Sequence, residues 1–390
     1  MNDGGDDEVD GRAGKLHQQE MSIMKQPGAI LALIIGLATA LILPNVCAYD
    51  KNASENAQEW LNLSLDIAGD ANARNGPDDL TRAELNLSLL SVEKSLDMDR
   101  NLSRSWEQKG DLLSQSGRYE EAAACYERLL NEDPMDQGVW LKKGQAFDGL
   151  NRWSEAIYCY NMVISCCQYW TSAGVSNNEA RKQEGDAWYN KAWDFSQLKD
   201  HEKALLCFNR SVEIFSDPNA SEDVNDLASS WSGKGNSLRA LGRYEEAMLC
   251  YDEIILSMDR YSPNVVNALS AKGLAELLLA RNLSSKDLQN AYLHYNLSAT
   301  YFAKAIETLE NDDNLTNDKD AWSDYFGEWV ALHYLPGREK HASDAFDKSI
   351  ALTGGMVMPS WGSLAGSLQG LFIRAKEGLG KCLPTRKYLM

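Results

Sequence analysis

The sequence is poor in histidine and lacks the short motifs of common enzyme classes. Its five histidines stand in unrelated contexts, and no His-Glu-X-X-His, Gly-X-Ser-X-Gly or Gly-X4-Gly-Lys-Ser/Thr pattern occurs. Gly362-Ser-Leu-Ala-Gly366 has its serine one position too early for a nucleophile elbow. We therefore expect no catalytic residues, no cofactor and no enzymatic activity.

Positive charge is also scarce, with 38 lysines and arginines against 57 aspartates and glutamates and a net charge of −19. A surface of that sign keeps a protein soluble and repels the phosphate backbone of nucleic acids. Nucleic acid is therefore not an expected partner.

Metal-ligand spacings are missing as well. No Cys-X-X-Cys or histidine-rich stretch supports zinc. Residues 311–320 are rich in Asp and Asn, but counting from Asp312 the sixth place is Asn317 and the twelfth is Ser323, where a calcium loop needs Gly and Glu. We expect no metal, and a solvated loop at 311–320.

What the sequence does contain is a 34-residue unit, written twice in succession between residues 103 and 170. The two copies are Trp106, Lys109-Gly110, Leu113, Gly117-Arg-Tyr119-Glu-Glu-Ala122, Cys125-Tyr126, Pro134, and Trp140, Lys143-Gly144, Phe147, Asn151-Arg-Trp153-Ser-Glu-Ala156, Cys159-Tyr160. Spacings of three and four predict two amphipathic helices per unit. Gly110 fits where the second helix approaches the backbone closely, Gly117 fits the turn, and Pro134 ends the second helix.

This pattern resembles the tetratricopeptide repeat family, in the subtype common in archaeal and bacterial arrays. The resemblance implies an all-α fold, a right-handed superhelical solenoid of helix-turn-helix repeats. It also implies binding of a peptide or protein segment along the concave face lined by the first helix of each repeat.

Further copies follow the same pattern. Clear repeats are expected at about 103–136, 137–170, 185–218 and 228–261, and degenerate ones at about 58–102, 266–311 and 322–355, within an array over 58–355. Intervals of 48 from Trp140 to Trp188 and 43 from Trp188 to Trp231 predict longer inter-repeat loops at 168–184 and 217–227. A lengthened turn is expected around 281–291, and a C-terminal capping helix and tail at 356–390.

The period also interprets the repeated cysteines, Cys125, Cys159, Cys207 and Cys250, which each precede the aromatic residue of a second helix. Side chains one packed helix apart are too distant for a disulfide, so we interpret them as packing residues. The adjacent Cys166 and Cys167 leave open a bridge to a distant cysteine, or a redox or metal role.

Two other residue types recur with the period. The tryptophans Trp106, Trp140, Trp188 and Trp231 are interpreted as packing residues. The lysines Lys109, Lys143, Lys191, Lys234 and Lys272 form a ladder along the first helices. They can pair with glutamates of the second helices or attract an acidic ligand.

The N-terminal region predicts export. Residues 1–28 read as a disordered acidic tail, 29–48 as a signal peptide or single transmembrane anchor, and 49–57 as a linker. The apolar run 29–43 is the only expected membrane contact, and translation can start at Met1, Met21 or Met24. Either reading places the array outside the cytoplasm, secreted or anchored.

Glycosylation acceptors support the same location, because all Asn-X-Ser/Thr tripeptides lie downstream of the apolar run. The candidates are Asn52, Asn62, Asn86, Asn101, Asn219, Asn282, Asn296 and Asn314. Asn209 lies within an expected second helix and is the acceptor least expected to be modified.

Matching the inward positions of the family onto this chain selects a set of groove candidates. They are Arg104, Glu107, Asp111, Leu141, Gln145, Asp148, Tyr189, Asn190, Trp193, Ser232, Asn236 and Arg239. Glu107 stands where the chaperone-tail-binding members have a clamp lysine, so that specificity is not supported. The expected function is a non-enzymatic interaction scaffold for an unknown protein or peptide. The alternative is a structural, self-associating glycosylated component of the cell envelope. The oligomeric state is not predicted.

Overall fold

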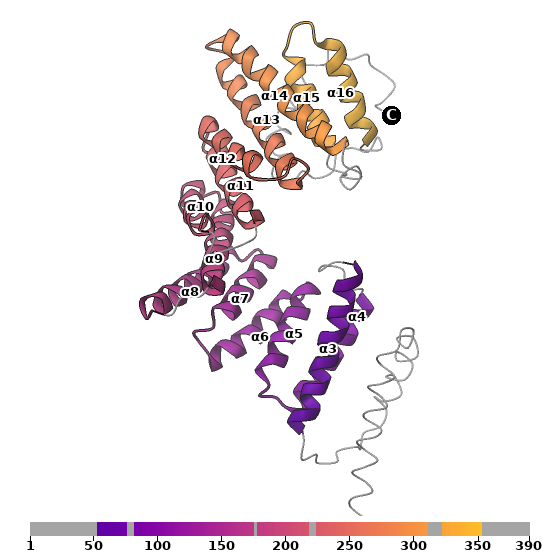
Figure 1. The fold of residues 1–390 in the computed structure, drawn as a ribbon, viewed down its shortest axis with the longest axis vertical. Helices are drawn as coiled ribbons and strands as arrows, with labels where there is room; N and C mark the ends of the chain where they lie inside the picture. Colours follow the sequence, from indigo (N-terminus) through magenta and orange to yellow (C-terminus); the bar gives the residue numbers. More distant parts are fainter. Residues whose placement is uncertain (1–52, 76–81, 175–177, 218–223, 311–321, 353–390) are drawn as a thin grey trace, which may run out of the picture. The chain divides into compact units, whose positions relative to one another are not determined.

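The computed structural model describes residues 53–75, 82–174, 178–217, 224–310 and 322–352 (Figure 1). Every element in these ranges is an α-helix, and the helices pair into hairpins, as the repeat pattern predicts. The expected N-terminal tail, the signal peptide or anchor, and the C-terminal cap at 356–390 lie outside the described residues. The chain divides into two compact units, residues 1–134 and 135–390.

The described residues of the first unit form two hairpins. They are α3 (Ala53–Asn75) with α4 (Arg82–Met98), and α5 (Ser103–Gln115) with α6 (Tyr119–Glu132). Buried serines join the hairpins: Ser95 Oγ lies 2.7 Å from Ser105 Oγ and donates to the carbonyl of Ala57 at 2.7 Å. These small polar side chains let α4 and α5 approach closely while their hydroxyl groups remain hydrogen-bonded.

In the second unit, the part of the chain that the structure describes forms five hairpins. Their helices are α7 (Gln137–Gly149) and α8 (Trp153–Ser172), α9 (Asn178–Gln197) and α10 (His201–Phe215), α11 (Val224–Ala240) and α12 (Tyr244–Ser257), α13 (Pro263–Leu283) and α14 (Leu288–Glu310), α15 (Trp322–His333) and α16 (Glu339–Leu352). The first helices of successive hairpins contact one another, α7 with α9, α9 with α11, α11 with α13 and α13 with α15. They therefore form a continuous row within this unit.

The expected glycine roles are confirmed. A Cβ placed on Gly110 would lie 2.6 Å from the ring of Tyr126, and Gly144 and Gly235 stand in the same relation to Tyr160 and Tyr251. The turn residue Gly117 has φ +75°, a left-handed conformation that favours glycine.

The inter-repeat loop expected at 168–184 differs from the expectation, because most of its residues lengthen helices, whereas most of 217–227 lies outside the described residues. Helix α8 continues to Ser172 and α9 begins at Asn178, so much of 168–184 is helical. The physical reason is packing: Gly185 lies against the ring of Phe215, and this contact favours helix in a stretch whose polar composition suggests a loop. The turn expected around 281–291 is likewise short, since α13 ends at Leu283 and α14 begins at Leu288.

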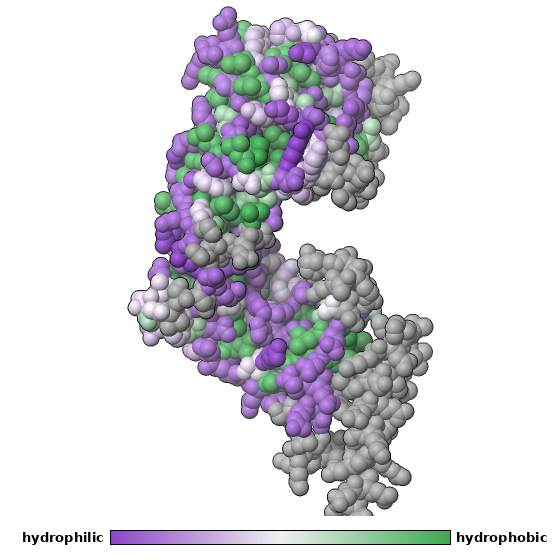
Figure 2. Space-filling model, viewed as in Figure 1, coloured by the Kyte–Doolittle hydropathy of each residue, from purple (hydrophilic) through white to green (hydrophobic). Residues whose placement is uncertain are grey.

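The surface is mixed. On the face shown in Figure 2, apolar patches interrupt a mostly polar surface. Exposed apolar side chains of the second helices include Leu206, Leu249 and Leu256. Within the described ranges, no helix combines the length and apolar character needed to cross a membrane.

The described cysteines are all buried and unbridged. Cys166 Sγ lies 3.9 Å from Met135 Sδ, and Cys167 donates weakly to Gln137 Oε1 and to the carbonyl of Ala180, each at 3.4 Å. In the described part of the chain the adjacent pair is therefore a packing element and not half of a disulfide.

Candidate functional site

The groove candidates of the second unit lie on three first helices that pack side by side. Helix α7 carries Leu141, Gln145 and Asp148, α9 carries Tyr189, Asn190 and Trp193, and α11 carries Ser232, Asn236 and Arg239. Each of these side chains is exposed or half-buried. One continuous surface of α7, α9 and α11 can therefore contact a ligand, and we call this surface the first-helix face.

The remaining candidates, Arg104, Glu107 and Asp111, lie on α5 in the first unit. Arg104 is exposed, while Glu107 and Asp111 are half-buried. They form a corresponding surface on that unit.

In several repeats, a tyrosine from the second helix forms a hydrogen bond with one polar residue of the first helix. The Tyr126 hydroxyl donates to Asp111 Oδ1 at 2.8 Å, and the Tyr251 hydroxyl donates to Asn236 Oδ1 at 3.0 Å. Tyr160 donates in the same way to the carboxylate of Asp148. Because each ring is fixed on its glycine, these hydrogen bonds order the face before a ligand arrives.

The central polar feature is a pair of carboxyl groups on adjacent first helices. Asp148 on α7 faces Asp194 on α9, and Asp194 is fully buried. Burial and the neighbouring Asp148 raise the pKa of Asp194 to about 9, and burial also raises the pKa of Asp148. Because both pKa values are raised, the two carboxyl groups together carry less than two full negative charges near neutral pH.

Helix α9, which carries Asp194, also carries two aromatic groove candidates, Tyr189 and Trp193. The rings of Trp193 and Trp153 are 5.2 Å apart in an edge-to-face arrangement, and Trp193 remains 40% exposed. Tyr189 packs edge-to-face on Phe208 at 5.8 Å. An exposed tryptophan fixed by a neighbouring ring is a suitable anchor for an apolar side chain of a peptide.

In some repeats the ladder lysines pair with acidic residues of second helices, which is the first of the two roles expected from the sequence. Lys109 Nζ lies 3.0 Å from Glu93 on α4, and Lys272 pairs with Asp252 on α12. Each ladder lysine also lies over an aromatic ring, for example Lys234 at 4.5 Å from the ring centroid of Trp231. In both ion pairs the acidic partner lies on the second helix of the preceding hairpin.

The described glycosylation candidates Asn62, Asn86, Asn101, Asn282 and Asn296 are exposed, and so is Asn209. A sugar-transferring enzyme must accommodate the backbone around the asparagine as well as reach its side chain. All of these asparagines except Asn101 lie within helices. Asn52, Asn219 and Asn314 lie outside the described residues.

Sequence reasoning missed Asp194 and the tyrosine hydroxyl groups. Asp194 stands one residue after the expected inward position, Trp193, and its partner is supplied by a different repeat. The tyrosines were recognised only as large packing residues. In two repeats a tyrosine follows a polar residue of the first helix by 15 positions, Asp111 to Tyr126 and Asn236 to Tyr251, and this spacing is the signal that could have found them.

Comparison with known proteins agrees with the repeat fold. Tetratricopeptide repeat models match residues 108–168, 185–218 and 228–256. A search of curated proteins found no match. The C-terminal part of a tetratricopeptide repeat protein from Cytophaga hutchinsonii aligns with a TM-score of 0.51 and 12% identity, over 79% of this chain and 99% of that chain.

Other solved structures align with lower scores. A tetratricopeptide repeat protein from Parabacteroides merdae has a TM-score of 0.42 at 14% identity, over 77% of this chain and 95% of that chain. PilF from Pseudomonas aeruginosa has a TM-score of 0.44 at 14% identity, over 68% of this chain and 97% of that chain. The sequence matches and the hairpin packing show that the chain contains tetratricopeptide repeats, over residues 108–168, 185–218 and 228–256.

Proposed function

We propose that the chain is a non-enzymatic scaffold that binds a peptide or protein segment on its first-helix face. The observation that carries this proposal is the continuous row of α7, α9 and α11. Its candidate residues are accessible, and tyrosines of the second helices form hydrogen bonds with two of them, Asp148 and Asn236. Stacked repeats of this kind provide extended binding surfaces in general. An ordered surface loses less conformational entropy on binding than a mobile one.

The chemistry of the face suggests the character of the bound segment. Trp193 offers an aromatic anchor, the Asp148–Asp194 pair offers negative charge, and Arg239 offers positive charge nearby along the row. A segment with an apolar residue flanked by polar or charged residues of both signs fits this arrangement.

We also propose that the array works outside the cytoplasm. The apolar run at 29–43 and the acceptors downstream of it support this location, and the exposure of Asn101 in a turn between helices is compatible with it. A mass shift of the cell-derived protein on treatment with a glycosidase tests it, together with mass spectrometry of the mature N-terminus. A product without glycans whose N-terminus precedes residue 29 and which fractionates with cytoplasmic proteins would contradict it.

The binding face is tested by site-specific photocrosslinking in the native cell. A photoreactive residue replaces Gln145, which is exposed on α7, and a matched one replaces Glu253, which is exposed on the second helix α12. We expect a defined crosslinked protein from position 145, reduced by the second change Trp193→Ala, and none from position 253. Equal crosslinking from both positions would contradict a specific first-helix face.

A further inference from the structure

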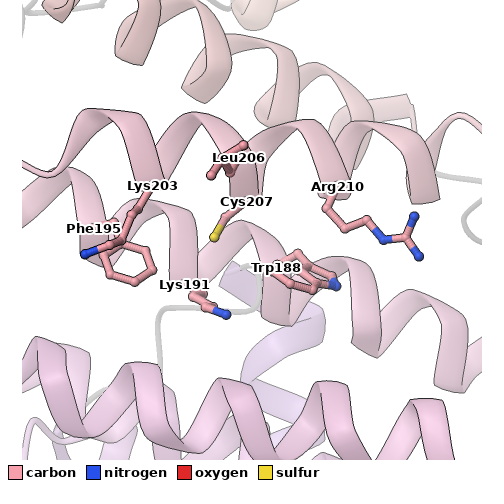
Figure 3. Close-up of a pocket in the computed structure, with 7 residues that line it drawn as sticks. All are labelled: Trp188, Lys191, Phe195, Lys203, Leu206, Cys207 and Arg210. Carbon is pink, nitrogen blue, oxygen red and sulfur yellow. The ribbon is translucent and has the colours of Figure 1, made fainter.

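A second surface on the third clear repeat has the features of a binding pocket. It is an open depression of about 490 Å³ lined by residues of α9 and α10 (Figure 3). Its floor is apolar, formed by Trp188, Phe195 and Cys207. Helical spacing puts Trp188, Lys191 and Phe195 on the side of α9 opposite Tyr189 and Trp193, so this pocket is separate from the first-helix face.

Three cations surround the floor, and no carboxylate lines the pocket. Figure 3 shows the Lys203 ammonium beside Phe195 at one end and the Arg210 guanidinium at the other, with Lys191 next to Trp188. In a chain with a net charge of −19, a cluster of this sign is a local exception.

The equivalent positions in the other repeats show how the exception arises. Lys203 stands four residues before Cys207, and the residues four before Cys125, Cys159 and Cys250 are Glu121, Glu155 and Glu246. Each of those glutamates pairs with an arginine three residues earlier, as Glu246 does with Arg243 at 2.6 Å. The third repeat has therefore exchanged a carboxylate for an ammonium group at this site.

Lys191 also lacks the carboxylate partner that an equivalent lysine has. Its counterpart Lys272 pairs with Asp252, which stands two residues after Cys250 on the preceding second helix. The residue two after Cys159, on the second helix that precedes Lys191, is Asn161. Lys191 makes no ion pair with any described residue and lies 4.5 Å from the ring centroid of Trp188.

The other two cations have only weakly held partners. Lys203 pairs with Asp200 at 2.7 Å and Arg210 with Glu213 at 2.6 Å, and both acids lie on the same stretch of chain and outside the pocket lining. The Lys203 side chain is 62% exposed, and the Glu213 side chain 67%. Exposed pairs of this kind contribute about 0–1 kcal/mol, so a ligand carboxylate can compete for the cations.

We propose that this pocket binds an acidic segment of a protein partner, in which an aromatic or aliphatic side chain lies beside a carboxylate. The apolar side chain packs on Trp188 and Phe195, and the carboxylates pair with Lys191 and Lys203. Charge complementarity selects this occupant, since the apolar floor alone would accept any hydrophobic residue. The inference rests on the scaffold function proposed above but uses a different surface.

The test uses the full chain and a fluorescent peptide of alternating Glu and Phe with blocked ends, followed by fluorescence anisotropy. The key variant is Lys203→Glu, which restores the residue type of the other repeats and should therefore fold. We expect its dissociation constant to rise about tenfold or more, with Lys191→Gln showing a smaller rise. The matched control Lys340→Glu makes the same charge change at an exposed site on α16 and should leave binding unchanged.

Equal affinity of the unaltered chain and Lys203→Glu would overturn the proposal, as would equal binding of a peptide with Lys in place of Glu. Absence of binding to the unaltered chain, or binding of anionic lipid vesicles in place of the peptide, would also overturn it. Trp193→Ala separates the two surfaces, since it should weaken crosslinking from position 145 and leave binding of the acidic peptide intact. Loss of one response without the other shows which surface has failed.

Discussion

The ring of Tyr160 lies so close to the backbone of Gly144 that a Cβ on that glycine would be 2.6 Å from Cε1. The same distance recurs between Tyr126 and Gly110 and between Tyr251 and Gly235. Each of these tyrosines also donates a hydrogen bond to a polar residue of the first helix. One tyrosine therefore contributes both to the packing of the two helices and to the position of a polar side chain on the first helix.

Gly144→Ala should destabilise the protein despite the better helix propensity of alanine. The added methyl group must displace a fully buried ring, which costs about 1–3 kcal/mol. Chemical denaturation measures the change in the free energy of unfolding. Gly69→Ala on α3 is the control: nothing lies within 4 Å of its Cβ, so it should be neutral or stabilising by up to about 1 kcal/mol. Equal effects of the two changes would contradict the close approach.

Tyr251→Phe isolates the hydroxyl group from the ring. The variant keeps the packing on Gly235 but removes the donor to Asn236, so we expect a loss of about 1 kcal/mol in the free energy of unfolding. The control is Tyr158→Phe, whose side chain is 58% exposed and should be unaffected. If the Tyr251 variant binds a partner as before, ordering of Asn236 does not contribute to recognition.

The repeat period predicts those parts of the fold that depend on neighbours in the sequence. The Gly110–Tyr126 contact, the turn at Gly117 and the packing role of Cys159 all follow from spacings within one unit. The Asp148–Asp194 pair does not, because its partners come from different repeats separated by an insertion. The position of α9 relative to α7 after this insertion depends on tertiary packing, and no local sequence pattern encodes it.

The same limit explains the loops and the small polar core. The stretch 178–184 is polar, and its helical state depends on contacts such as that of Gly185 with Phe215. Ser211 and Ser230 are both fully buried with their hydroxyl oxygens 2.8 Å apart. From the sequence alone, a serine is expected to be exposed to solvent. These two serines are core residues only because α10 and α11 approach each other closely.

The native protein should expose few reactive thiols. Burial raises the pKa of Cys125 and Cys250 to about 11 and that of Cys167 to about 12, so little thiolate forms at pH 8. Titration with an aromatic disulfide reagent should modify at most Cys47 and Cys382 rapidly, since the other six of the eight cysteines are buried. All eight should react in denaturant. Rapid reaction of more than two thiols in the folded protein would contradict the packing role of the repeated cysteines.

Asp194→Asn should change how stability depends on pH. The folded-state pKa of Asp194 is raised from 3.8 to about 9, so between these values the folded chain holds a proton that the unfolded chain has released. Unfolding then releases that proton, and the free energy of unfolding contributed by this group falls as the pH rises through the window. The slope is at most about 1.4 kcal/mol per pH unit.

Asparagine mimics the protonated acid at every pH, so the variant should lose this slope and gain stability over the unaltered chain as the pH rises from 5 to 9. Urea denaturation at several pH values measures the difference, using protein from a host without N-glycosylation because the change creates an Asn-Phe-Ser acceptor. Asp344→Asn, at an exposed position on α16, should leave the slope unchanged. A pH dependence identical in the Asp194 variant and the unaltered chain would mean that the pKa of Asp194 is not raised in the folded chain, and the negative charge assigned to the first-helix face would then be too small.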